Sequence, residues 1–75
     1  MARAARRRLE LVAVADLGGG GWAELLHDGD RWRVLAQHPD ASVDGVEWLV
    51  SVAYGPFRLR SEAEDRIASL VEVAA

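Results

Sequence analysis

Two segments that flank an Asp-Gly pair restrict this chain to a fold containing a β-hairpin. Residues 22–27 and 30–37 lie on either side of Asp28-Gly29. Asp and Gly tolerate the positive φ angles of a type I′ turn, which joins two antiparallel strands. The second segment alternates apolar and polar residues, a period that buries one face of a strand and leaves the other in water. Its expected buried face carries Trp32, Val34 and Ala36, and its wet face carries Arg31, Arg33 and Gln37.

Further strands are predicted on both sides of this hairpin. Residues 46–54 alternate in the same way and are expected to end before Gly55-Pro56. Proline lacks the N–H of a central strand, so a loop is predicted from His38 to Gly45. Residues 9–15 favour another strand, although helix remains open because Ala and Leu are good helix formers. The glycines at 18–21 are expected to form a flexible connector.

A C-terminal helix is predicted over residues 61–73. Ser61 and Glu64 have the spacing of a capping box, in which the hydroxyl accepts from the Glu64 N–H and the carboxylate reaches back. The residues after them form one apolar stripe at helical spacing. Its members are Ala63, Ile67, Leu70, Val71 and Ala74.

These elements predict an α+β fold, with a three- or four-stranded antiparallel sheet and one C-terminal helix packed on one face. The 75 residues can build only one core. We expect residues 1–8 to be a flexible basic arm and residues 9–75 to be a single α+β domain. The expected core is Trp32, Val34, Trp48, Val50, Val52, Ile67 and Leu70.

Charge is distributed unevenly along the chain. The net charge is −3, yet four of the nine arginines precede residue 9, and the rest of the chain carries five arginines against twelve carboxylates, a net −7. The acidic body repels phosphate, whereas the arginine arm attracts it. The apolar stretch after the arm is interrupted by Glu10 and stopped by Asp16, which argues against a signal peptide and a membrane partner. A cytoplasmic location is expected, consistent with the absence of cysteine.

No arrangement of residues points to catalysis, a metal or a cofactor. There is no cysteine nucleophile, and Ser61 is explained as a helix cap. His27 and His38 are expected near opposite ends of one strand, too far apart to share a zinc ion. The glycine run lacks the G-K-[ST] ending of a phosphate loop. We therefore expect a protein that is not an enzyme and has no cofactor or metal site.

Two kinds of binding surface remain. Trp22 follows the glycines at a strand edge, and tryptophan is favoured at protein interfaces. With Glu24 and Glu47 as acidic neighbours, it predicts a surface that docks on a larger protein. The alternative is a nucleic-acid surface, which would use the arm and the arginines beyond it. Its residues are Arg3, Arg6, Arg7, Arg8, Arg31, Arg33, Arg58 and Arg60.

Residues 46–72 resemble known families. A strand leads to Tyr54-Gly55-Pro56-Phe57 and then to the Ser61-Glu62-Ala63-Glu64 helix start. This order is similar to the arm-type DNA-binding domain of phage integrases, a three-stranded antiparallel sheet with an aromatic turn and a helix. The sporulation-related repeat that binds peptidoglycan has a similar segment, but also needs a helix and a final strand for which this chain has no counterpart. The integrase resemblance implies a phage or mobile-element origin and DNA contacts from Arg31 and Arg33.

The sequence therefore predicts a non-enzymatic binding module, an accessory or regulatory protein that docks on a larger protein. The acidic body favours this interpretation over nucleic-acid binding, which remains the alternative. The oligomeric state stays open, a homodimer included.

Overall fold

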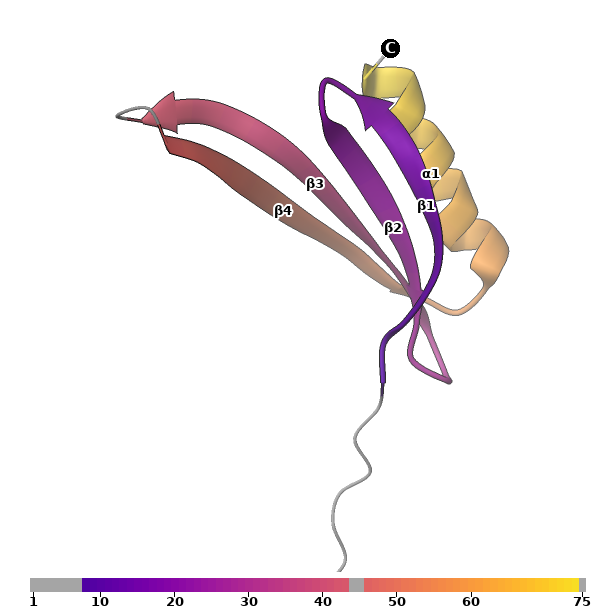
Figure 1. Cartoon of the computed structure of the whole chain (residues 1–75). Helices are drawn as coiled ribbons and strands as arrows, with labels where there is room; N and C mark the ends of the chain where they lie inside the picture. Colours follow the sequence, from indigo (N-terminus) through magenta and orange to yellow (C-terminus); the bar gives the residue numbers. More distant parts are fainter. Residues whose placement is uncertain (1–7, 44–45, 75) are drawn as a thin grey trace, which may run out of the picture.

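Four antiparallel strands form one sheet, and a helix lies on one of its faces (Figure 1). The computed structural model describes the backbone of residues 8–43 and 46–74 and the side chains of residues 8–39 and 49–73. The strand order is that of the sequence. Four strands and one C-terminal helix confirm the predicted α+β fold, and the segment that follows the arm is a strand and not a helix. The elements are β1 (Glu10–Gly18), β2 (Gly21–His27), β3 (Trp32–Val43), β4 (Val46–Phe57) and α1 (Arg60–Ala74).

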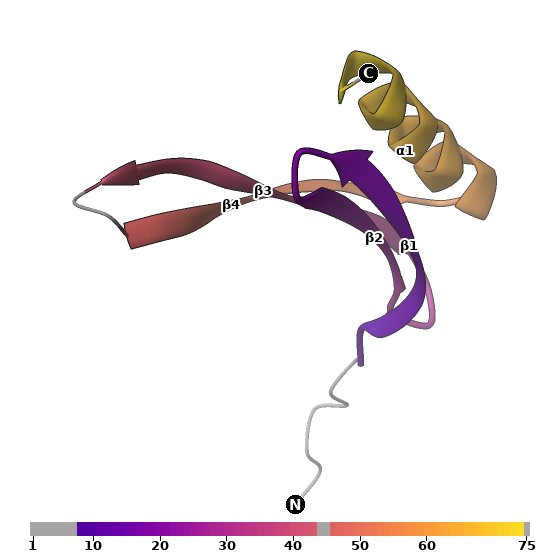
Figure 2. The same cartoon turned by 45° about the horizontal axis from the view of Figure 1, so that its top comes forward.

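The pairing register sorts the residues of the sheet into two faces, because directly paired side chains in an antiparallel sheet share a face. α1 covers only one face (Figure 2). The helix-side face contains Ala13, Ala15, Ala23, Leu25, Val34, Ala36, Val52 and Tyr54. The opposite face, here called the open face, contains Leu11, Val14, Asp16, Trp22, Glu24, Leu26, Arg33, Leu35, Gln37, Ser51 and Ala53.

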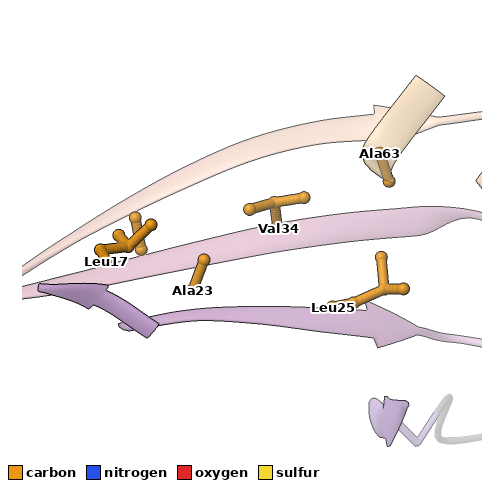
Figure 3. Packing of buried hydrophobic residues seen from close by; sticks show 6 residues of the cluster. Leu17, Ala23, Leu25, Val34 and Ala63 are labelled. Atoms are coloured by element: carbon orange, nitrogen blue, oxygen red, sulfur yellow. The ribbon is translucent and has the colours of Figure 1, made fainter. Parts of the chain in front are cut away.

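The core lies between α1 and the middle of the sheet (Figure 3). Its largest fully buried side chains are Leu25 and Val34, which pair across β2 and β3. Ala63 is the one buried residue of α1 among those described, and its small side chain lets the helix backbone come close to the strands. The buried residues are Leu17, Ala23, Leu25, Val34, Ala36 and Ala63, with Trp32, Tyr54, Phe57, Ile67 and Leu70 packed against them.

The predicted core was wrong for β4. Val50 and Val52 lie on the expected face, yet their side chains are 40% and 37% exposed. The 15 residues of α1 extend about 22 Å at 1.5 Å per residue. The 12 residues of β3 extend about 40 Å, so one helix cannot cover the whole sheet. The far half of the β3–β4 hairpin projects beyond it (Figure 2). The Trp48 side chain lies outside the described residues.

Both prolines of the chain lie inside strands, contrary to the expected strand ends. β3 continues through Pro39, which pairs with Leu49 of β4. On the other side of β3 the pairing with β2 stops at Gln37, so Pro39 lies where β3 has become an edge strand, and a proline is tolerated there. Pro56 lies in β4, the last strand of the sheet, at a register irregularity.

The turn between β2 and β3 is built by the Asp28 side chain. Its carboxylate accepts hydrogen bonds from the Asp30 N–H (2.9 Å) and the Arg31 N–H (2.8 Å). The Asp28 N–H donates to the Arg31 carbonyl at 3.1 Å. The hairpin is confirmed, but the turn occupies residues 28–31 and β3 begins at Trp32. Arg31 therefore lies in the turn and not on the wet face of a strand.

The glycine run closes the β1–β2 hairpin as a tight turn, not as a flexible connector. Gly18, Gly19 and Gly20 have φ angles of 80°, 59° and 82°, which side chains with a Cβ rarely adopt. The Asp16 carboxylate accepts from the Gly18 N–H at 2.8 Å and helps to fix the start of this turn.

The helix cap differs from the predicted Ser61–Glu64 box. α1 begins at Arg60, and the Leu59 carbonyl accepts from the Ala63 N–H at 3.4 Å. The Glu62 carboxylate reaches back to the Leu59 N–H at 3.0 Å, which is the second half of a capping box with Leu59 as the N-cap. Glu64 instead pairs with Arg60 at 3.3 Å.

The core position of Leu25 leads to a stability prediction. Leu25→Ala should lower the free energy of unfolding by about 2–5 kcal/mol, because it removes a buried side chain and leaves a cavity. Leu49 is 58% exposed, so Leu49→Ala should change stability by no more than about 0.5 kcal/mol. Urea denaturation monitored by circular dichroism measures both. Equal losses would contradict the placement of the core.

The cap predicts a second contrast. Glu62→Ala removes the acceptor of the Leu59 N–H and a negative charge at the positive end of the helix, and should cost about 0.5–1 kcal/mol. Ser61→Ala should have almost no effect, because Ser61 lies inside the helix. Thermal melts of the two variants distinguish this arrangement from the predicted one. A larger loss in Ser61→Ala would favour the Ser61–Glu64 box.

Candidate functional site

The open face is a sheet surface with several apolar side chains that the described residues leave uncovered. No described helix or strand packs on it, since α1 lies on the other face (Figure 2). Trp22, Leu26 and Leu35 are half-buried in their own sheet. Leu11 and Val14 on β1 are 55% and 57% exposed. An uncovered apolar patch bordered by polar residues is typical of a protein interaction surface.

Trp22 is held in place at the end of β2 that follows the glycine turn. Its indole N–H donates to the Glu24 carboxylate at 2.9 Å, and the two residues are next-but-one neighbours on β2. In the register Trp22 stands between Asp16 on β1 and Gln37 on β3. The hydrogen bond satisfies the polar group of the indole, so the ring can serve as an apolar contact surface without an unsatisfied donor.

Trp22 and Glu24, two of the three residues predicted for protein docking, are therefore brought together. The partial exposure expected for Trp22 is confirmed. Glu47 lies on β4, and its side chain is outside the described residues. Polar groups extend the face toward β4, where the Ser51 hydroxyl donates to the Gln37 side-chain carbonyl at 3.1 Å.

The sequence analysis did not identify the other apolar residues of the open face. Leu26 and Leu35 belong to the strands of the predicted hairpin, and Leu11 and Val14 to the segment before the glycines. On each strand these residues alternate with buried ones, and this alternation could have assigned them to the opposite face of the sheet. It was overlooked because the open face of the second strand was judged from Arg31, Arg33 and Gln37 alone.

Three predicted nucleic-acid arginines are paired with carboxylates. Arg33 lies on the open face and contacts Asp28 at 3.3 Å. Arg31 contacts Asp30 at 3.5 Å. Arg60 contacts Glu64 at 3.3 Å and lies 5.5 Å from the centre of the Trp32 ring. Each carboxylate offsets the positive charge that a phosphate would need.

These arginines also do not form one surface. Arg60 lies over Trp32, a residue packed against the core, whereas Arg33 is on the open face. Arg8 and Arg58 are exposed, one just before β1 and the other between β4 and α1. Arg3, Arg6 and Arg7 lie outside the described residues.

Other site chemistry is limited in the described part of the chain. No group of three or more His, Cys, Asp or Glu residues there is placed to hold a metal ion. His27 is stacked on Trp32, with the ring centres 4.2 Å apart. α1 is neither long enough nor apolar enough to cross a membrane.

Comparisons of the chain with protein-family models, curated proteins and solved structures found no match. The resemblance to the integrase domain therefore stays a prediction, and the candidate site rests on its own geometry.

The contact between Trp22 and Glu24 predicts a local spectroscopic change. Glu24→Ala removes the acceptor of the indole N–H, so the Trp22 Hε1 proton should exchange faster with solvent and shift upfield. The Trp32 Hε1 signal should not move, because Trp32 lies on the other face. Proton–nitrogen correlation NMR measures both. An unchanged Trp22 signal would show that the hydrogen bond is absent in solution.

Proposed function

We propose that this chain is a non-enzymatic protein-binding module, an accessory or regulatory protein whose open face docks on a larger protein. The observation that carries the proposal is the half-buried Trp22, hydrogen-bonded to Glu24 at 2.9 Å on a sheet face that no described helix or strand covers. We place its function in the cytoplasm, where a chain without cysteine is at no disadvantage.

The properties of Trp22 suit an interface anchor. Tryptophan residues that lie near the centre of an interface often carry a large share of the binding energy. The hydrogen bond to Glu24 holds the ring before binding, which reduces the conformational entropy lost in the complex. Leu35, diagonal to Trp22 across β2 and β3, and Leu26, further along β2, add apolar area to the same face.

Charge indicates what the partner surface contains. Asp16 and Glu24 flank Trp22, and the chain from residue 9 onward has a net charge of −7. Complementary charge favours encounter and fixes orientation more than it adds affinity. The partner therefore presents an apolar pocket for the indole, bordered by Lys or Arg residues.

Nucleic-acid binding remains a second candidate, supported by the arginines of residues 1–8 and by the position of Arg33 on the open face. It is weaker because Arg31, Arg33 and Arg60 are paired with carboxylates. Retention on heparin and gel shifts at increasing salt test it, since phosphate contacts produce a steep salt dependence. Tight, salt-sensitive binding lost on removal of residues 1–8 would favour nucleic acid.

The docking proposal predicts that Trp22 matters more than the arm. A partner is identified by affinity capture from the source cells, and its affinity for the purified chain is then measured by calorimetry. Trp22→Ala should weaken binding about 30-fold or more, equivalent to about 2 kcal/mol. Removal of residues 1–8 should change the affinity only slightly.

Val73→Ala provides the control. Val73 is 82% exposed on α1, on the side of the sheet away from Trp22, so this variant should bind the partner like the parent. Thermal melts establish that each variant is folded. Partner binding that is indifferent to Trp22 and dependent on residues 1–8 would contradict the proposal.

A further inference from the structure

β1 is an edge strand with apolar side chains. It is the first strand in the sheet, and within residues 8–43 and 46–74 no strand pairs with its outer side. Edge strands are commonly protected by charged side chains, proline or β-bulges. β1 has no lysine or proline, and its Glu10 and Asp16 lie toward its two ends. Its regular stretch is short, because register irregularities lie between Leu11 and Ala13 and between Asp16 and Gly18.

A groove runs beside this regular stretch. Residues 13–15 of β1 form one wall, Ile67 and Ala68 of α1 form the other, and the buried Leu25 contributes to the lining. Glu64 is the only charged residue of the lining. The volume of the groove, about 280 Å³, falls just below the range of small-molecule pockets, roughly 300–1,000 Å³. The groove has room for side chains of a chain lying along β1.

The edge of β1 determines what kind of ligand can bind there. The outward N–H and C=O groups of an edge strand can form hydrogen bonds with the backbone of another extended segment. Strand addition to a sheet edge uses main-chain hydrogen bonds for affinity and pockets for alternate side chains for specificity. Along such a segment, every second side chain would enter the groove between β1 and α1. The remaining side chains would lie on the open face, beside Val14 and Asp16.

Charge specifies this segment further. β1 and α1 together carry six carboxylates and two arginines, a net charge of −4. On the open face Asp16 lies on the edge strand itself and Glu24 lies one strand further in, opposite Val14, whereas the groove is lined mainly by apolar residues. An added strand therefore suits the site when apolar side chains face the groove and basic side chains face the open face. A second copy of β1 would instead add its own Glu10 and Asp16 beside an edge that is already acidic.

We propose that residues 13–16 of β1 bind an extended segment of a partner protein by strand addition, with alternate apolar side chains in the groove formed with Ile67 and Ala68, and basic side chains on the open face beside Asp16. The inference goes beyond docking through Trp22, since that contact requires no added strand. The short regular stretch makes this a weak and reversible contact.

The test uses a hexapeptide of alternating arginine and valine with blocked ends, titrated into the full ¹⁵N-labelled chain. The amide signals of residues 13–16 and of Ile67 and Ala68 should shift and saturate. A peptide with N-methylated backbone amides on one edge should bind about tenfold more weakly, because the main-chain hydrogen bonds are lost. Replacing arginine with glutamate should weaken binding to a similar degree.

Two variants of α1 separate the groove from the rest of the helix. Ala68→Leu fills the groove and should weaken peptide binding about fivefold or more, whereas Ser69→Leu, outside the groove lining, should leave it unchanged. Both residues are exposed, and melting curves verify that both variants fold. Trp22→Ala should retain peptide binding, so failure of this inference is distinguishable from failure of the Trp22 proposal.

The proposal is overturned if the arginine–valine peptide does not bind saturably, if the N-methylated peptide binds equally well, or if the shifts lie away from β1. Concentration-dependent contacts between β1 strands of two molecules would show that a second copy of the chain occupies the edge, and would also overturn it.

Discussion

The rest of the structure depends on the mismatch in length between one helix and its sheet. α1 can shield only the part of the helix-side face around Leu25 and Val34, where Ala63 allows close packing. This contact leaves three surfaces of the described sheet uncovered: the open face, the outer edge of β1 and the distal half of the β3–β4 hairpin. A small domain buries a limited share of its surface, so uncovered apolar area is where such a chain has most to gain from a partner.

Polar contacts on these surfaces explain how apolar residues are tolerated there. Glu24 satisfies the indole of Trp22, and Asp28 both organises the β2–β3 turn and pairs with Arg33. The contact with Asp28 also offsets the positive charge that Arg33 could present to a phosphate. The Asp28 side chain is only 5% exposed, so its pair with Arg33 is more shielded from water than an exposed ion pair, which contributes about 0–1 kcal/mol.

The sequence predicted the strands, the hairpin, the helix and the buried side of the segments 30–37 and 46–54, because period-two alternation and apolar spacing are local properties. It missed what depends on neighbours along the sheet. Pro39 lies inside β3 because β2 has already ended, and Val52 is exposed because α1 does not reach it. The cap was misplaced by two residues, since the sequence pattern favours Ser61 whereas the geometry uses Glu62. For the site, Trp22 and Glu24 were predicted, but their direct hydrogen bond and the leucines beside them required the register.

The open face and the β1 edge are not independent surfaces. Asp16 links the two, because it lies on the edge strand and pairs with Trp22 of β2, while Glu24 of β2 pairs with Val14 of the edge strand. A strand added to β1 would extend the open face by one strand, with its basic side chains on that face and its apolar side chains in the groove. Basic residues on that strand would meet the same carboxylates that border the indole. One partner could thus use a folded surface for Trp22 and an extended segment for β1, and the two contacts would strengthen each other because the second becomes intramolecular once the first has formed.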